Sequence, residues 1–427
     1  MNNINTTKNN IANGCFDDAL VRVYGNENLE NAKNRYLHLA ELFEEKYTDG
    51  TDIHFFSAPG RTEVCGNHTD HNHGQVLAAA INLDAVACAA KTENNTIRVK
   101  SENYPEDVVD LSSLSPDTAE FGTSKGLIRG VAARFSELGY NIGGFDAVTV
   151  NSVLKGSGLS SSAAFEVLIG TVLNHLYNDG KISAVEIAQI AQYSENKFFG
   201  KPCGLMDQMA CSVGGFVQID FADPSKPVIN PVSFDFATCK HALCIVDTRA
   251  DHADLTDEYA AIRQEMEAVA GFFGKNNLRE TNEDDIFSNL KEIREKLGER
   301  PLLRAMHFYD DNRRVAAEAE ALAKGDFEAF KALTISSGRS SYMYNQNVFA
   351  ASQPLSQPVS LALALSERIL KDKGGAWRVH GGGFAGTIQA FVPENTLDEY
   401  KTRMEALFGE NSCYVLAIRP FGGTMVK

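Results

Sequence analysis

A glycine- and serine-rich stretch, Gly156-Ser-Gly-Leu-Ser-Ser-Ser162, has the composition of a phosphate-binding loop. Residues 145–150 before it alternate and are β-branched, which predicts a strand, and apolar residues recur at helical spacing from Ala164 onward. Glycines let the backbone approach a ligand closely, and free amides at a helix N-terminus bind anions. A phosphate is therefore the expected occupant, and a serine hydroxyl there could also bind Mg²⁺. The alternative is an ordinary capped helix after a tight turn, because no Gly-Lys-Ser/Thr follows the glycines as in the common P-loop.

A second polar stretch, residues 61–74, lies between two apolar runs. A strand enters it, and a Pro-Gly turn at residues 59–60 is predicted to present Arg61 to a ligand. The stretch holds four potential metal ligands, His68, Asp70, His71 and His73. A metal site and a solvated turn are two possible interpretations. Carboxylate, amide and imidazole groups together, however, suit a hydroxyl-rich ligand best. The sequence therefore favours a sugar-binding loop.

A third candidate is Asp207, a carboxylate in an apolar segment. A capping box at residues 183–186 predicts a helix that carries Glu195, and glycines at 200–204 end this helix just before Asp207. A carboxylate in such a segment is capped, paired or used in catalysis, and on this observation alone a structural role is favoured. A glycine triplet at 381–383, ahead of a predicted strand, indicates either a bulged turn or close backbone approach to a ligand.

Length and charge limit the classes of function. A chain of 427 residues is long enough for two or three domains, and its formal net charge of −16 argues against nucleic-acid or anionic-membrane partners. The first residues contain no apolar signal segment, and the eight cysteines form no CxxC pair, so we expect free thiols and a cytoplasmic enzyme. Residues 1–14 are polar and are predicted to be loosely attached, and a Pro-containing segment at 224–231 marks the expected domain boundary.

Four stretches, in this order, resemble the GHMP small-molecule kinases and, within them, the galactokinases. They are Ala58-Pro-Gly-Arg61 with Gly66-Asn-His-Thr-Asp70, Val153 to Ala164, Cys203-Gly-Leu-Met-Asp207-Gln208, and Val379 to Gly386. The resemblance implies an α+β, two-domain GHMP kinase fold with mixed sheets, helices packed on them, and an active site in the interdomain cleft. The expected domains are residues 15–225 and 226–427.

The resemblance also implies a role for each matched residue. The implied catalytic residues are Asp207, which takes a proton from the anomeric hydroxyl of a sugar, and Arg61, which stabilises developing charge. The implied ATP-binding residues are Gly156, Ser157, Gly158, Leu159, Ser160, Ser161, Ser162 and Ser101. The implied sugar-binding residues are Asn67, His68, Asp70, Gly204 and Tyr259. The implied Mg²⁺ ligands are Ser162 and Glu195. ATP, Mg²⁺ and a small-molecule sugar are the expected partners; the oligomeric state is open, with a monomer expected.

The sequence departs from the galactokinase signature Glu-His-Thr-Asp-Tyr-Asn-Gly-Gly at Asn67, His71 and His73. The family's glutamate is expected to meet the sugar near C6, and an amide in its place does not repel an anion. Two alternatives to a galactose 1-kinase follow. One is a kinase for a sugar altered near C6, such as galacturonate, and the other is a non-catalytic sugar sensor on the same fold.

Overall fold

The computed structural model describes residues 4–47, 52–153, 158–201, 203–250, 255–384 and 386–427. Its larger sheet has the strand order β12-β1-β2-β5-β3-β4, and β6 and β7 extend it from β2. The strand bounds are β1 His54–Cys65, β2 Gln75–Lys91, β3 Thr96–Ser101, β4 Glu106–Asp110, β5 Phe145–Asn151, β6 Phe216–Asp220, β7 Val228–Val232 and β12 Thr424–Met425. Because β3 and β5 are parallel while the other pairs are antiparallel, this sheet is mixed, as predicted.

The second sheet is antiparallel, with the order β11-β8-β10-β9. Its strands are β8 His241–Asp247, β9 Ala376–His380, β10 Thr387–Pro393 and β11 Cys413–Leu416. The predicted domain boundary after residue 225 falls between β6 and β7, which form a hairpin of the larger sheet. The chain enters the second sheet at β8. The last strand of the chain, β12, belongs to the larger sheet again and pairs with β1. The division into residues 15–225 and 226–427 therefore stays a prediction.

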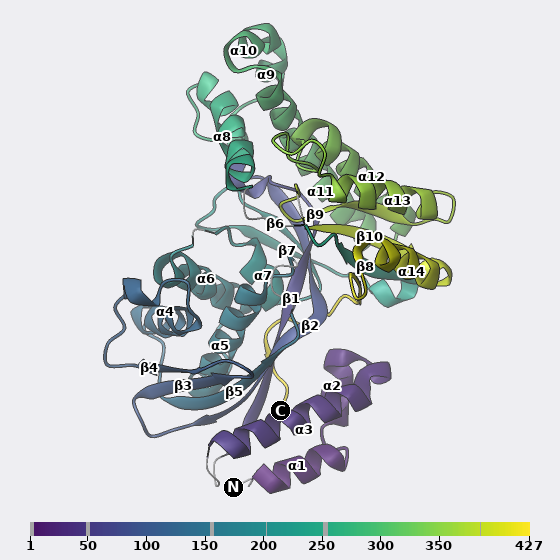
Figure 1. The fold of residues 1–427 in the computed structure, drawn as a ribbon. Helices are drawn as coiled ribbons and strands as arrows, with labels where there is room; N and C mark the ends of the chain where they lie inside the picture. The colour runs from purple at the N-terminus through teal and green to yellow at the C-terminus, as the bar shows by residue number, and fades with distance from the viewer. Residues whose placement is uncertain (1–3, 48–51, 154–157, 202, 251–254, 385) are drawn as a thin grey trace.

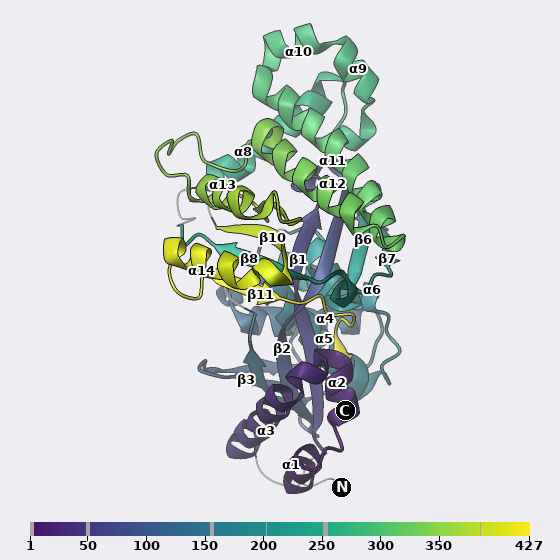
Figure 2. The same ribbon diagram turned by 90° about the vertical axis from the view of Figure 1, so that its right-hand side faces the viewer.

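Helices cover both faces of the larger sheet and surround the second one, as Figures 1 and 2 show. Their bounds are α1 Ile4–Ala12, α2 Asp17–Tyr24, α3 Leu29–Lys46, α4 Ser124–Glu137, α5 Ser161–Tyr177, α6 Ala184–Ser194, α7 Met206–Val213, α8 Thr256–Phe272, α9 Glu283–Ser288, α10 Leu290–Leu297, α11 Glu299–Ala323, α12 Phe327–Ser340, α13 Pro358–Leu370 and α14 Leu397–Phe408. One side carries α5 and α7, and the other carries α3. The central strand β2 is buried along most of its length, which explains its run of alanines and aliphatic residues.

Residues 4–12 are not loosely attached, which corrects the sequence-based expectation for this part of the N-terminal segment. Residues 4–12 form α1, whose Ile4 and Ile11 are buried in one cluster with Tyr36 and Phe43 of α3. In Figure 1, α1, α2 and α3 lie together below the larger sheet, next to the C-terminus. The Asn-rich composition concealed two apolar residues at helical spacing, and their burial against α3 holds the segment.

The helices α11 and α12 are separated by a short turn, in which Gly325 has a φ of 71°. The second of these helices ends in a serine-rich stretch, residues 336–340, which stays helical as far as Ser340. Its serines are held by buried partners, since the Ser337 hydroxyl donates to Asp311 at 2.8 Å. These contacts satisfy hydroxyls that would otherwise compete with the helix backbone.

All eight cysteines are free thiols, and five of them are buried. Across the described ranges, no helix combines the length and the apolar character needed to cross a membrane.

Candidate active site

The strand β1 positions Arg61 through an irregularity in its pairing with β2. The register shifts between Pro59 and Arg61, so the predicted Pro-Gly turn is wrong and a bulge inside a continuous strand takes its place. A Cβ on Gly60 would lie 2.8 Å from the carbonyl oxygen of Leu159, so only glycine allows this approach. The Arg61 amide then donates to the same carbonyl at 3.1 Å. The bulge thus joins β1 to the end of the glycine-serine loop.

Asp207 lies in the first turn of α7 and faces Arg61. The Nε and Nη2 atoms of Arg61 are each 2.8 Å from Oδ1 of Asp207, and the Ser160 hydroxyl donates to Oδ2. Burial by itself would raise the pKa of Asp207, but the charge of Arg61 and the bond from Ser160 outweigh it and hold the pKa below its usual value. Asp207 is therefore ionised at neutral pH. About a third of its side chain, 33%, remains exposed, which leaves room for a substrate.

The helix α5 begins at Ser161, and its N-terminal amides are open to a ligand. Ser160 is the N-cap residue and has a φ of 57°, but its hydroxyl bonds to Asp207 and does not cap the helix. Ser161 is held from the side by Asn151, whose Nδ2 donates to its hydroxyl at 2.8 Å. Free amides and the helix dipole favour an anion at this position. Gly156 and Ser157, which were predicted to bind ATP, lie outside the described residues.

A cavity of about 1030 Å³ opens over this helix terminus. The predicted ATP-binding residues that line it are Ser101, Gly158, Ser160, Ser161 and Ser162, together with Arg61 and Asp207. Lys201 lines it too, and Leu127, Phe165 and Phe199 add apolar surface. Leu159 is fully buried and contributes its backbone carbonyl to Arg61. The cavity therefore combines positive charge and open amides with an apolar wall, which suits a nucleotide.

The two predicted Mg²⁺ ligands lie next to each other. The Ser162 hydroxyl is 3.4 Å from Oε1 of Glu195, which lies in a π-helical segment after α6. Gln208 donates to Oε2 of Glu195 at 2.6 Å and orients this carboxylate, and Lys201 lies 3.2 Å from Oε1. A hydroxyl and a carboxylate are hard oxygen ligands of the kind Mg²⁺ takes beside substrate phosphates, so the residues fit this ion.

The residues predicted to bind the sugar form two groups. Asn67, His68 and Tyr259 all contact the glycine triplet 381–383: His68 Nε2 lies 2.9 Å from the carbonyl oxygen of Gly382, and the Tyr259 hydroxyl donates to that of Gly383 at 2.9 Å. Asp70 belongs to the second group and packs on Gly204, where a Cβ would lie 2.9 Å from Oδ2 of Asp70.

Within the described ranges, no three His, Cys, Asp or Glu side chains converge into a metal site. The histidines of the 61–74 stretch contact other protein groups instead of converging on one point. Burial and the neighbouring His71 lower the pKa of His68 to about 4, so His68 is neutral at physiological pH. His73 lies 3.4 Å from Nδ2 of Asn277.

Three polar side chains near these residues were not assigned a role from the sequence. Lys201 and Gln208 contact Glu195, and Glu63 follows Arg61 by two residues on β1. The alternation of a strand could have indicated Glu63, because residues i and i+2 project to the same face. No local pattern predicts the contacts of Lys201 and Gln208, which depend on how α6 and α7 pack.

Two family models and several solved structures are similar to this chain. The model for the GHMP kinases N terminal domain matches residues 126–215, and that for the galactokinase galactose-binding signature matches residues 41–91. The crystal structure of Lactococcus lactis galactokinase complexed with galactose is 25% identical, with a TM-score of 0.75, over 91% of this chain and 99% of that chain.

More distant structures share the fold. A D-glycero-D-manno-heptose 1-phosphate kinase from Bacteroides thetaiotaomicron is 18% identical, with a TM-score of 0.59 over 88% of this chain and 99% of that one. Methanococcus jannaschii mevalonate kinase is 14% identical, with a TM-score of 0.60 over 86% of this chain and 98% of that one. The chain is thus similar to the GHMP kinases over both matched segments, and its galactokinase-like sugar-binding signature differs from the signature sequence at residues 67, 71 and 73.

Proposed function

We propose that this protein is an ATP-dependent sugar 1-kinase that phosphorylates the anomeric hydroxyl of galactose or a close relative. The observation that carries the proposal is the Arg61–Asp207 pair at the open N-terminus of α5. It places an ionised carboxylate and a guanidinium beside a terminus suited to phosphate, in a cavity of nucleotide size. Phosphoryl transfer depends mainly on positioning and charge neutralisation, which these groups supply.

Each residue of this site has a separate role in the transfer. Asp207 accepts the proton of the anomeric hydroxyl as this oxygen attacks the γ-phosphorus of ATP, the bond from the γ-phosphorus to the bridging oxygen breaks, and ADP leaves. Arg61 keeps Asp207 ionised and faces the developing negative charge on the transferred phosphoryl group. The amides at the start of α5 hold the phosphates, and Lys201 adds a positive charge to the same cavity. Ser162 and Glu195 would hold Mg²⁺, which neutralises phosphate charge when bound.

Fewer observations bear on the identity of the sugar. The galactose-binding signature and the galactose-bound structural relative support galactose or a neutral relative, with His68, Asp70, Gly204 and Tyr259 around the sugar. A C6-altered sugar such as galacturonate is the second candidate, because Asn67 replaces the glutamate of the signature. A non-catalytic, sensor-like role is the third, and the presence of Asp207 and of the serines at the start of α5 counts against it.

The test is ATP consumption by the purified full chain with Mg²⁺ and a panel of free sugars: galactose, galacturonate, N-acetylgalactosamine, arabinose and glucose. Mevalonate serves as a control acceptor, because mevalonate kinase shares the fold. We expect turnover with galactose and a product whose phosphorus signal couples to the anomeric proton. Turnover with mevalonate alone, or phosphate on another hydroxyl, contradicts the proposal. Catalytic silence with retained galactose binding supports the sensor.

A further inference from the structure

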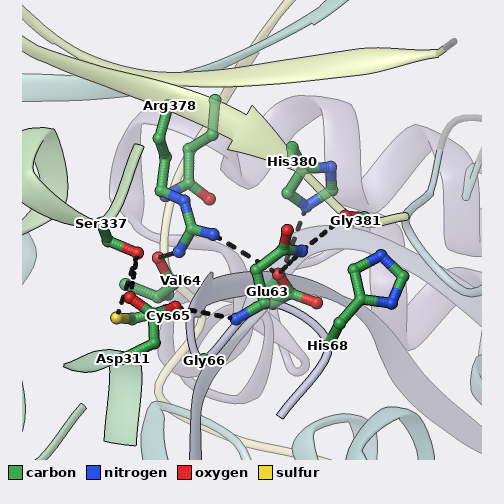
Figure 3. A network of polar contacts seen from close by, with 12 residues as sticks. Glu63, Val64, Cys65, Gly66, His68, Asp311, Ser337, Arg378, His380 and Gly381 are labelled. Atoms are coloured by element: carbon green, nitrogen blue, oxygen red, sulfur yellow. Dashed lines mark hydrogen bonds and ion pairs between the residues drawn. The ribbon is translucent and has the colours of Figure 1, made fainter. Parts of the chain in front are cut away.

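The amide of Asn67 has no donor left for a sugar. Its side chain is fully buried, and its Nδ2 donates at 2.7 Å both to Oε1 of Glu63 and to the carbonyl oxygen of Gly381. Its Oδ1 accepts from Nδ2 of Asn347 at 2.6 Å. An amide group has two hydrogens, so both are used within the protein. Figure 3 shows the surroundings of Glu63, which lies between Arg378 and Gly381, the first residue of the glycine triplet.

Glu63, by contrast with Asn67, lies on the same side of β1 as Arg61. The pairing of β1 with β2 is regular here, with Arg61 opposite Ala80 and Glu63 opposite Ala78. Successive side chains of a strand alternate, so Arg61 and Glu63 project to one face, one pleat apart. Thr62 between them projects the other way and bonds to Gln389 of β10 at 2.9 Å.

The Glu63 carboxylate is held at one oxygen and open at the other. Oε1 accepts from Asn67 and lies 3.7 Å from Nη2 of Arg378, whose Nη1 donates to the carbonyl oxygen of Val64 at 2.7 Å. Oε2 accepts no hydrogen bond from a described residue and is not fully enclosed, although only 8% of the side chain is exposed. An acceptor this buried carries a free-energy cost unless a ligand satisfies it.

We propose that Glu63 is the specificity-determining carboxylate of the sugar site, and that Asn67 is a positioning residue that orients Glu63 and fixes the glycine triplet. This inference rests on the proposed sugar kinase function and selects the substrate class within it. The carboxylate that the signature carries at position 67 is supplied from position 63, so the pocket takes a neutral, hydroxyl-rich sugar that donates to Oε2. A uronate would bring its own carboxylate toward Glu63 and Asp70 and is rejected. The substitution at Asn67 therefore does not open the site to anions.

The experiment measures binding of galactose and galacturonate to the full chain by calorimetry, with Mg²⁺ and a non-hydrolysable ATP analogue present. For the unaltered protein we expect galactose to bind at least about tenfold more tightly than galacturonate. In E63Q, loss of a charged acceptor should weaken galactose binding by about tenfold or more and reduce its advantage over galacturonate. Affinity for the ATP analogue should stay within about twofold, which a general structural defect would not allow.

The matched control is E318Q. Glu318 on α11 is also buried beside Arg378, and burial raises its pKa to about 8, so a neutral amide mimics its protonated form. We expect galactose affinity to be unchanged in this variant. Equal or tighter binding of galacturonate by the unaltered protein overturns the inference without any variant, as does an E63Q protein that keeps full galactose affinity. If neither sugar binds and no sugar is phosphorylated, the proposed function fails as well.

Discussion

Two nitrogens of Arg61, Nε and Nη2, lie 2.8 Å from the same oxygen of Asp207, which leaves the second carboxylate oxygen to Ser160. The three residues come from β1, α7 and the N-terminus of α5, so one ionic contact fixes the relative positions of a strand and two helices. It also sets the charge state of the proposed base. Two predictions follow from this pair, one for turnover and one for its pH dependence.

Replacing Asp207 with Asn should abolish most of the turnover and leave nucleotide binding intact. The amide keeps the shape of the side chain but cannot accept the proton of the anomeric hydroxyl. General base catalysis contributes about 10²- to 10⁴-fold to rate, and we expect a loss in that range. Single-turnover ADP formation and the Kd for ATP measure the two effects. A D207N enzyme with a nearly normal rate would remove Asp207 from the mechanism.

Arg61 should control the pH dependence through Asp207. The pKa of Asp207 is lowered, so kcat/KM falls only when the pH drops far enough to protonate it. In R61Q the charge is lost while burial remains, so the acid limb should move to higher pH by about one pH unit or more. R61K keeps the charge and should leave the limb close to its original position. If both variants show the original limb, another group sets it.

Glu195 should determine the Mg²⁺ requirement. Its carboxylate lies 3.4 Å from the Ser162 hydroxyl and is oriented by Gln208. E195Q should raise the Mg²⁺ concentration that gives half-maximal activity by about tenfold or more, because even outer-shell changes cost this much. E137Q, which alters an exposed carboxylate paired with Arg134, is the control. Chelation with EDTA should stop turnover in the unaltered enzyme.

Asp84 should be one of the main contributors to stability. It is fully buried and is bound by Arg35, Ser57, Tyr24 and Arg419, with the Tyr24 hydroxyl 2.7 Å and Arg419 Nη1 3.0 Å from Oδ2. D84N leaves two arginines without their counter-charge, so the free energy of unfolding should fall by about 3–5 kcal/mol in urea titrations. D179N, which alters an exposed aspartate paired with Lys181, should change it by less than about 0.5 kcal/mol.

The same aspartate predicts how the stability difference depends on pH. Burial by itself would raise the pKa of Asp84, but Arg35 and Arg419 lower it below its usual value in the folded state. A lowered pKa contributes stability above the unfolded value of about 3.9, and this contribution disappears as pH falls through the folded pKa. The gap between the unaltered protein and D84N should therefore be constant at neutral pH and shrink below about pH 4. A gap that grows on acidification contradicts this assignment.

The first helix should contribute to global stability. Ile11 of α1 is fully buried against α3, so I11A should lower the free energy of unfolding by about 2 kcal/mol or more. N9A, at an exposed position of the same helix, should have little effect. Equal stability of I11A and the unaltered protein would mean that α1 is loosely attached, as composition alone predicted.

The sequence by itself determined the features that depend on neighbours along the chain. The order of β5, glycine-serine loop and α5 follows from periodicity, and the Ser183 hydroxyl accepts from the amide of Glu186 at 3.2 Å, as the capping box predicts. Because these signals act over a few residues, composition and spacing are enough to detect them. The motifs that resemble the GHMP kinases are equally local.

Tertiary structure alone decided where the polar side chains point. Arg61 and Asp207 are 146 residues apart, and they meet because a bulge in β1 lies against the loop before α5. The resemblance implied that Asn67 contacts the sugar. Packing against residues 381–383 buries its amide, and Oε2 of Glu63 is left without a hydrogen bond from a described residue. Which of two polar residues is desolvated depends on elements that arrive from far along the chain, and spacing within a motif carries no information about them.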